Sequence, residues 1–326
     1  MIKARETIAS CINAEPEEIF FTSGGTESDN WAIKSSTLYN SDYKVITSAF
    51  EHHAVLKTCA DIERLGNPVE YLQPSTDGYI LPETLNNAIT KQVRLVSIMF
   101  ANNEIGSIQP IKELCRIAHS KGALFHTDAV QAVGHINIDV KELDIDMLSA
   151  SAHKFNGPKG IGFLYVKKGT PITPYIHGGS QEYNLRAGTE NIAAIVGMSI
   201  ALRNNIQQMN FNQSHILSLE KNLIQKLRET GVAFARNGGD YTLPGLISLS
   251  FPNRDGESVF HRMDLKGICI STGAACNSKE TEVSHVLQAI KLDAIYANGT
   301  IRISLGKNNS VEDTEVIANT LIKCVC

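Results

Sequence analysis

Apolar residues along the chain follow two patterns, which predict two kinds of element. Short, nearly continuous apolar runs are typical of strands buried within a sheet. They occur at 18–22, 43–49, 93–100, 122–131, 147–150 and 161–166. Other segments carry apolar residues every three to four positions, as on one buried face of a helix. These segments are 2–12, 55–62 and 111–118. Strands that alternate with helices predict an α/β fold with a mostly parallel sheet.

The pattern changes near Asn212, where amphipathic helices and shorter strands begin. A long helical region is expected over 191–206, and strands are expected at 246–251 and 300–304. A chain of 326 residues suits one large and one smaller domain. We therefore predict a large domain over residues 1–211 and a smaller α/β C-terminal domain over residues 212–326.

Composition excludes several classes of protein. A formal net charge of -4 gives no basic footprint, so no nucleic-acid partner is expected. No apolar run is long enough to span a membrane, and residues 1–20 lack the core of a signal peptide. The seven cysteines have neither disulfide-framework nor metal-site spacing. We expect reduced thiols, a cytoplasmic protein and no bound metal.

A lysine lies between two of the apolar runs, in the segment Ser151–Gly160. This position does not suit a solvated surface charge, and two interpretations of Lys154 are open. It is either a turn lysine just clear of the core or an amine that forms a Schiff base with a carbonyl cofactor. Asp128 ends the preceding predicted strand. An acid for a pyridinium nitrogen, followed one strand later by a lysine, is what pyridoxal phosphate (PLP) chemistry requires.

Three further segments carry candidate chemistry. Ser23-Gly-Gly-Thr26 joins a strand to a helix, where backbone N–H groups can close on an anion; an ordinary capped turn is the alternative. Asn102 and Asn103 follow a central strand, where ligands bind in open α/β sheets, although turn-forming asparagines would look the same. Cys276 lies in 271–282, a segment rich in small and polar residues and predicted to be a mobile loop.

Three other cysteines are expected to be buried packing residues. Apolar periodicity puts Cys59 and Cys115 in the core, and Cys269 is expected to pack within a buried strand at 267–270. Cys276 is the cysteine predicted to be exposed, either incidentally or as a nucleophile.

Eight motifs occur in one order over nearly the whole chain. They are Thr22-Ser-Gly-Gly-Thr-Glu-Ser-Asp-Asn30, Glu51-His52, Asn102-Asn-Glu-Ile-Gly106, His126-Thr-Asp-Ala-Val-Gln131, Ser151-Ala-His-Lys154, Arg186-Ala-Gly-Thr189, Ser271-Thr-Gly-Ala-Ala-Cys276 and Ile301-Arg-Ile-Ser-Leu-Gly306. In this order the chain resembles the cysteine desulfurases of the NifS/IscS type, which are class V aminotransferase relatives. The resemblance implies PLP-dependent transferase fold type I, with a seven-stranded-type sheet between helices.

The resemblance also implies a set of cofactor-binding residues, at strand ends and helix starts. They are Gly25, Thr26, His52, Asn103, Asp128, Gln131, Ser151, His153, Lys154 and Thr189. In the family, the match of His52 stacks on the ring and takes part in proton transfer, and that of Gln131 bonds the cofactor's O3′. The match of Thr189 binds the phosphate of the other subunit, which implies a homodimer with shared active sites.

The implied reaction converts L-cysteine to L-alanine. Lys154 removes the α-proton, Arg302 holds the substrate carboxylate with Asn103 nearby, and Cys276 accepts the sulfur as a persulfide. The persulfide would pass to an iron–sulfur scaffold or another sulfur-acceptor protein. A selenocysteine lyase or another PLP lyase of this fold is the alternative within the enzymes.

The two ends of the chain depart from the family pattern. Nothing here matches the opening Asp-Asn-Ala-Ala-Thr-Thr-like motif of the family or the longer tail of some members. From the sequence we expect intact PLP binding with poor desulfurase turnover. A truncated, non-catalytic homologue acting as a binding partner is the alternative from another class.

Overall fold

The structure is a computed structural model that describes residues 1–37, 42–272 and 283–325. The chain divides into two compact units. Unit 1 consists of Met1–Gln73, Ile80–Ala101 and Gln109–Met209, and unit 2 consists of Pro74–Tyr79, Asn102–Ile108 and Asn210–Cys326. Unit 2 therefore takes in two short segments from the first third of the chain, for which the apolar pattern gave no signal.

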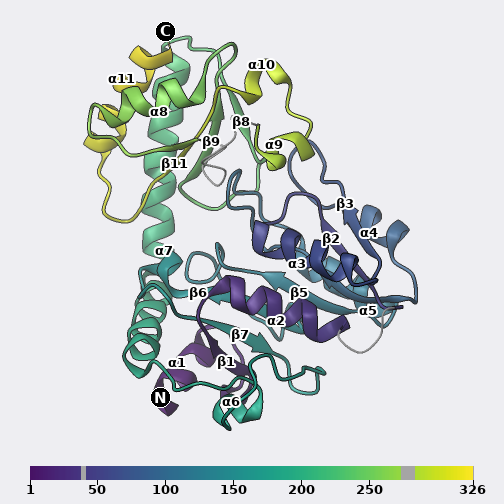
Figure 1. Cartoon of the computed structure of the whole chain (residues 1–326). Helices are drawn as coiled ribbons and strands as arrows, with labels where there is room; N and C mark the ends of the chain where they lie inside the picture. The colour runs from purple at the N-terminus through teal and green to yellow at the C-terminus, as the bar shows by residue number, and fades with distance from the viewer. Residues whose placement is uncertain (38–41, 273–282, 326) are drawn as a thin grey trace. The chain divides into compact units, whose positions relative to one another are not determined.

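Unit 1 is built on a sheet of seven strands in the spatial order β1-β7-β6-β5-β4-β2-β3 (Figure 1). Neighbouring strands from β6 to β3 run parallel, whereas β7 runs antiparallel to both β6 and β1. The predicted α/β class with a mostly parallel sheet is confirmed. The strands are β1 (Ile19–Thr22), β2 (Lys44–Ser48), β3 (Val69–Leu72), β4 (Val93–Ser97), β5 (Leu124–Asp128), β6 (Met147–Ser151) and β7 (Gly162–Val166).

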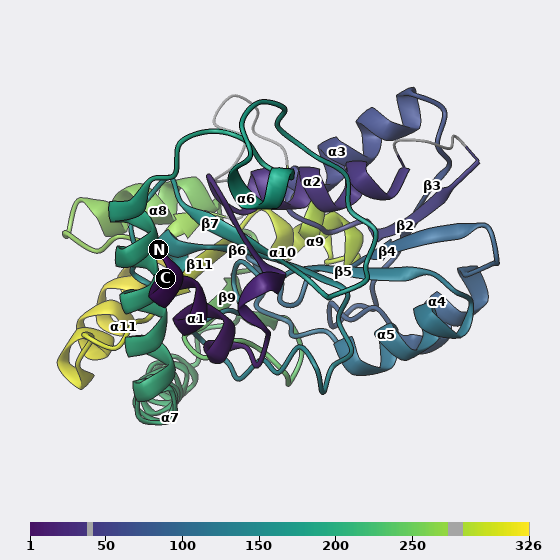
Figure 2. The same cartoon turned by 90° about the horizontal axis from the view of Figure 1, so that it is seen from below.

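Helices cover both faces of this sheet. Helices α2 and α3 pack side by side on one face, and α4 and α5 lie on the other (Figure 2). The helices of unit 1 are α1 (Ile2–Cys11), α2 (Gly25–Thr37), α3 (His53–Arg64), α4 (Pro82–Ala88), α5 (Ile111–Ser120) and α6 (Gln181–Asn184), with short 3-10 turns η1 (Pro16–Glu18) and η2 (Ala152–Phe155). Cys59 of α3 and Cys115 of α5 are fully buried, as the apolar spacing predicted.

One aromatic side chain fixes α2 on the sheet. Trp31 is fully buried, with its ring edge-to-face against Phe20 at 5.6 Å and stacked near Tyr175 at 6.1 Å. Its indole Nε1–H donates to the backbone oxygen of Thr173 at 2.8 Å, so the polar end of the ring is satisfied. The first turn of α2, which holds the glycine motif, is thereby held against the strand ends.

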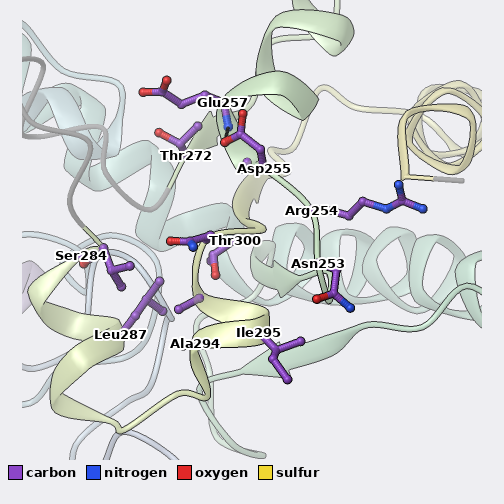
Figure 3. A pocket seen from close by; sticks show the side chains of 14 residues that line it. Asn253, Arg254, Asp255, Glu257, Thr272, Ser284, Leu287, Ala294, Ile295 and Thr300 are labelled. Atoms are coloured by element: carbon purple, nitrogen blue, oxygen red, sulfur yellow. Dashed lines mark hydrogen bonds between the residues drawn. The ribbon is translucent and has the colours of Figure 1, made fainter.

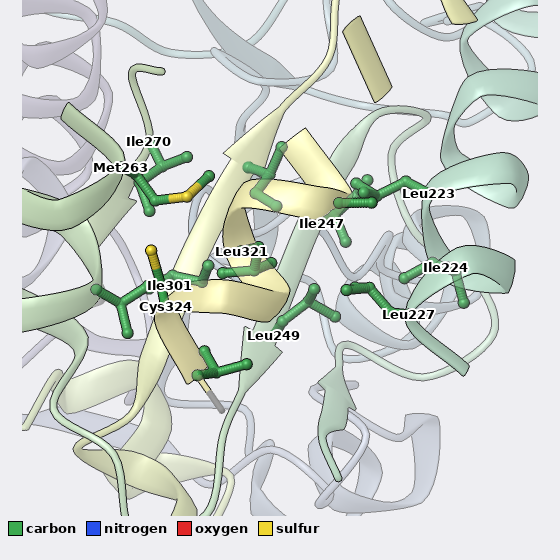
Figure 4. Close-up of a cluster of buried hydrophobic side chains, with 14 of the residues drawn as sticks. Leu223, Ile224, Leu227, Ile247, Leu249, Met263, Ile270, Ile301, Leu321 and Cys324 are labelled. Atoms are coloured by element: carbon green, nitrogen blue, oxygen red, sulfur yellow. The ribbon is translucent and has the colours of Figure 1, made fainter. Parts of the chain in front are cut away.

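Unit 2 contains a four-stranded antiparallel sheet in the order β10-β11-β9-β8. Alternate residues of β9 take different roles: Ile247 and Leu249 join the apolar core (Figure 4), whereas Ser248 and Ser250 accept hydrogen bonds from the amide of Asn237. The elements of unit 2 are β8 (Ala235–Asn237), β9 (Leu246–Ser250), α8 (Gly256–Asp264), β10 (Ser271–Thr272), α9 (His285–Ala289), α10 (Ala294–Ala297), β11 (Thr300–Ser304) and α11 (Val311–Val325).

Two sequence expectations are corrected here. The helix expected over 191–206 is α7 (Ile192–Glu229), which runs without interruption from unit 1 into unit 2. Its later turns bury Leu219, Leu223 and Leu227 in the core of unit 2 (Figure 4), so the change of apolar pattern marks a new packing partner rather than a helix end. Residues 267–270 are not a strand, and Cys269 is exposed.

None of the helices in the described residues is long and apolar enough to cross a membrane.

Candidate active site

The glycine motif meets the end of β6 within unit 1. A Cβ atom placed on Gly24 would lie 3.4 Å from the hydroxyl oxygen of Ser151, and one on Gly25 would lie 2.4 Å from Cγ2 of Val130. Gly25 is therefore a position where a side chain would collide with the segment that follows β5. The N-terminus of α2, where the first N–H groups have no partner within the helix, thus lies at the ends of β5 and β6, a geometry that suits an anion.

Asp128 is buried at the last position of β5. One of its carboxylate oxygens accepts a hydrogen bond from the backbone N–H of Val130 at 2.9 Å. Burial raises the pKa of Asp128 to about 6, and the bond from Val130 and the positive charge of Lys154 both act against that rise. A cationic group beside this carboxyl would therefore hold it ionised.

Lys154 lies in η2, between β6 and β7, where the sequence put it. Its side chain and that of His153 are exposed, so the argument that this lysine is badly placed for solvent is wrong for the single chain. The turn is fixed through the backbone, because His135 Nε2–H donates to the Lys154 carbonyl oxygen at 2.7 Å. Ser151 Oγ is hydrogen-bonded to Nδ1 of His153 at 2.9 Å, which links two of the predicted phosphate ligands.

Glu51 and His52 follow β2. His52 is the N-cap of α3, and its Nδ1 accepts the N–H of Ala54 at 3.1 Å, which fixes the orientation of its ring. Glu51 is fully buried and accepts hydrogen bonds from Ser48 Oγ at 2.5 Å and from the N–H of Met99 at 2.9 Å. Burial raises the pKa of Glu51 to about 8, and the charge of Asp128 adds to that rise.

A buried polar cluster under α2 was missed by sequence reasoning. His126 on β5 is hydrogen-bonded through Nδ1 to Ser97 at 2.8 Å and through Nε2 to Ser149 at 2.9 Å. Asp29 of α2 lies 3.7 Å from the same Nε2. Burial lowers the pKa of His126 to about 3 and raises that of Asp29 well above its usual range. The available signal was the presence of polar residues inside the apolar runs at 93–100, 122–131 and 147–150.

The segment Arg186–Thr189 is tied to the glycine motif by an ion pair. The Arg186 guanidinium donates to both carboxylate oxygens of Glu27, at 2.8 and 3.1 Å. Thr189 is exposed, and the side chain that caps the start of α7 is that of Asn191, which accepts the N–H of Ala194 at 3.2 Å. A helix-capping role for Thr189 is therefore excluded.

The remaining described candidates lie in unit 2. Arg302 on β11 donates through Nη1 to the backbone oxygen of Asn103 at 2.9 Å and through Nη2 to Ser271 Oγ at 3.2 Å. Cys276 lies outside the described residues. The structure thus groups the predicted residues into two sets, one in each unit, and Gln131 and Thr26 belong to the first set.

Unit 2 also holds a cavity of about 550 Å³ beside Thr272 and Ser284 (Figure 3). Its wall includes Asp255 and Leu287, and its lining mixes polar and apolar groups. It contains none of the predicted site residues.

The chain belongs to the aminotransferase class V family, whose model matches residues 1–317. Cysteine desulfurase IscS of Dictyoglomus turgidum is 46% identical over 326 residues, covering 99% of this chain and 83% of that protein. The family resemblance found in the sequence is confirmed.

Solved structures agree with this assignment. A NifS-like protein matches with a TM-score of 0.90 at 38% identity, covering 99% of this chain and 85% of that one. A structure described as SspA in complex with cysteine matches with a TM-score of 0.82 at 36% identity, covering 95% and 87% of the two chains. The predicted PLP-dependent transferase fold is confirmed by these likenesses.

The buried position of Glu51 predicts a pH-dependent stability. An acid whose pKa is higher in the folded protein than in the unfolded chain binds more protons when folded, so the free energy of unfolding falls as pH rises between the two values. For Glu51 this window runs from about 4.3 in the unfolded chain to about 8 in the folded protein. Glu51→Gln removes the titration. Between pH 5 and 8 the free energy of unfolding of the variant should therefore rise by about 1 kcal/mol or more relative to that of the wild type.

Urea unfolding of the cofactor-free protein at several pH values measures this difference. Glu83→Gln, at an exposed acid in the first turn of α4, is the matched control and should leave the pH profile unchanged. Parallel profiles for the Glu51→Gln variant and the wild type would contradict the burial argument.

Proposed function

We propose that the protein is a PLP-dependent cysteine desulfurase, which converts L-cysteine to L-alanine and keeps the sulfur on Cys276. The observation that carries the proposal is the buried Asp128 at the end of β5, within the electrostatic reach of Lys154 on the turn after β6. Relatives named cysteine desulfurase IscS and a related structure with cysteine support the substrate class.

The residues of unit 1 fit the cofactor. Its phosphate would be held at the N-terminus of α2 by Gly25, Thr26, Ser151 and His153, where N–H groups and a hydroxyl converge. Asp128 would pair with the protonated ring nitrogen. Burial raises the pKa of this carboxyl to about 6, and a positive charge beside it would stabilise its ionised form. When bound, PLP supplies an electron sink for the carbanion formed at the substrate's α-carbon.

The other proposed roles belong to this chain's own side chains. Lys154 would hold the cofactor through its side-chain amine, and the same amine would take the substrate's α-proton. His52, whose imidazole is oriented by the start of α3, would lie against the cofactor's ring and would move protons there. Gln131 and Asn103 are proposed to bond the cofactor's phenolic oxygen.

Sulfur transfer uses residues of unit 2. Arg302 presents a planar fork that suits the substrate carboxylate. The thiolate of Cys276 bonds to the substrate sulfur while the carbon–sulfur bond of cysteine breaks. L-Cysteine and the Cys276 thiol together give L-alanine and a Cys276 persulfide, so atoms and electrons balance. An iron–sulfur scaffold or another acceptor protein would then take the sulfur.

We also propose that the protein acts as a homodimer in the cytoplasm. Ile192, Val196 and Ile200 form an exposed apolar stripe on the first turns of α7, next to the exposed Thr189 that would serve the partner's cofactor phosphate. The five described cysteines are free thiols, which suits a reducing compartment. The large domain (1–211) would bind PLP and the small domain (212–326) would carry Cys276.

The first test concerns the attachment of the cofactor. Borohydride reduction of the PLP-loaded protein, followed by peptide mass spectrometry, should find the pyridoxyl group on Lys154. Lys159 lies on the same connection between β6 and β7 and serves as the internal control. A label on Lys159, or no label in fully loaded protein, would overturn the assignment.

The second test concerns the substrate carboxylate. Arg302→Ala should lower kcat/KM for L-cysteine by about 30-fold to several thousand-fold, the cost of losing a charge-assisted pair of about 2–5 kcal/mol. Arg302→Lys keeps the charge without the fork and should recover only part of the loss. Both variants should keep PLP, measured by absorbance. A variant that loses PLP and keeps its affinity for cysteine would contradict the role.

The third test concerns the sulfur acceptor. Cys276→Ser should bind PLP normally and lose at least about a hundred-fold in alanine formation, because the nucleophile is gone. Cys269→Ser is the matched control, since Cys269 is exposed in the same unit and should be dispensable. Persulfide-selective alkylation with peptide mapping identifies the carrier. Full activity of Cys276→Ser would refute the mechanism.

A further inference from the structure

The segment Asn102–Ile108 is a loop that is closed by hydrogen bonds between its own residues. The Asn102 side-chain oxygen accepts the N–H groups of Glu104 at 2.8 Å and Ile105 at 3.1 Å. The backbone closes on itself, since Asn102 N–H donates to Ser107 and Gly106 N–H donates to Asn102, both at 3.0 Å. The backbone of Glu104 is therefore fixed by hydrogen bonds on both sides.

The Glu104 side chain reaches the start of α9. One carboxylate oxygen accepts the hydroxyl of Ser284 at 2.5 Å. The same hydroxyl oxygen accepts the N–H of Val286 at 3.1 Å, so Ser284 is also the N-cap of α9. One serine thus joins the helix to the loop, and it needs an acceptor at Glu104 to do so.

Arg302 connects the same loop to the other side of the cysteine-bearing stretch. Its Nη1 donates to Asn103, the neighbour of Glu104, and its Nη2 donates to Ser271. Ser271 precedes and Ser284 follows the undescribed residues 273–282. The described residues on either side are therefore both bound to one short loop, through Arg302 on one side and Glu104 on the other.

Glu104 and Arg302 also interact by charge. Burial raises the pKa of Glu104 to about 7, while the bond from Ser284 and the positive charge of Arg302 favour its ionised form. Among the described residues, Arg302 is the charged group that acts on Glu104. An ionised Glu104 compensates part of the charge that Arg302 would offer to a substrate carboxylate.

We propose that Glu104 is a positioning residue that sets both the strength of substrate-carboxylate binding at Arg302 and the placement of Ser284 at the start of α9. The proposal rests on the proposed desulfurase function. It predicts different results for two variants. Glu104→Gln removes the charge and keeps an acceptor for Ser284, so it changes substrate affinity alone, whereas Ser284→Ala also loosens the start of α9.

The first experiment follows L-alanine, the proposed product, which carries the same carboxylate and no sulfur. Its Kd for the PLP-loaded enzyme is measured from the absorbance change between about pH 6 and pH 8.5. The ratio of wild-type Kd to Glu104→Gln Kd should be near one at pH 6, where Glu104 is protonated. It should rise to about two- to five-fold above pH 8, the range of an exposed to half-buried charge pair. Comparison at equal pH removes the titrations that both proteins share.

The second experiment follows placement without any cofactor. Hydrogen exchange of the backbone amides in 285–292 should be faster in Ser284→Ala than in Ser284→Thr, which keeps both hydrogen bonds. In the loaded enzyme, Ser284→Ala should move the pH at which alanine affinity changes to a higher value, because the hydroxyl bond that favours the ionised form of Glu104 is lost. Glu312→Gln, at an exposed acid in the first turn of α11, is the control and should alter none of these values.

The outcomes distinguish the two levels of the argument. If the wild type forms neither alanine nor persulfide, the proposed function fails, while the exchange measurement still tests the Glu104–Ser284 link. If Glu104→Gln keeps the wild-type pH dependence of Kd, or if exchange in Ser284→Ala equals that in Ser284→Thr, the positioning role is refuted.

Discussion

The number of charges that the interior of unit 1 can hold is the constraint on which its candidate site depends. Three carboxyl groups, those of Asp29, Glu51 and Asp128, are buried near one another. The charge of Asp128 raises the pKa of both Asp29 and Glu51, and the charge of Glu51 also raises that of Asp29. Such a group cannot contain three negative charges. Asp128 has a lower pKa than Glu51 and has the positive charge of Lys154 nearby, so the end of β5 is the place where a negative charge is best held. An uncharged Glu51 still accepts hydrogen bonds at one carboxyl oxygen, from the hydroxyl of Ser48 and from the N–H of Met99.

The elements that carry this site were predictable because their signals are local. A buried parallel strand appears as a continuous apolar run, and β5 ends at Asp128 as its run indicated. Two consecutive glycines indicate the turn before α2, and the apolar spacing predicts α5. Lys154 was expected on the right turn, but its exposure was not, because an apolar run on either side says nothing of how far a turn extends beyond the sheet. The prediction that Cys269 is buried in a strand was wrong for a related reason, because a short segment of apolar character does not distinguish a strand from irregular backbone.

The contacts that orient the site were not predictable, because they join positions far apart in the chain. Glu27 and Arg186 are separated by 159 positions, and Glu104 and Ser284 by 180. Each residue alone fits an ordinary surface position, so nothing in its neighbourhood in the sequence distinguishes it. His126, Ser97 and Ser149 are an intermediate case, since polar residues inside apolar runs indicate a buried network but not its partners.

The path of the chain explains why unit 2 contains residues from so early in the sequence. The chain leaves unit 1 after Gln73 and again after Ala101, and it returns each time within a few residues. Both excursions are held by bonds to later parts of unit 2: the Tyr79 hydroxyl donates to the backbone oxygen of Gly238 at 3.2 Å, and Asn103 accepts from Arg302 at 2.9 Å. A cut at the end of unit 1 would remove those partners and leave both excursions without them. Each unit is therefore compact, although unit 2 is assembled from three separate stretches of the chain, and the stretch that accepts a hydrogen bond from Arg302 follows β4 in the sequence.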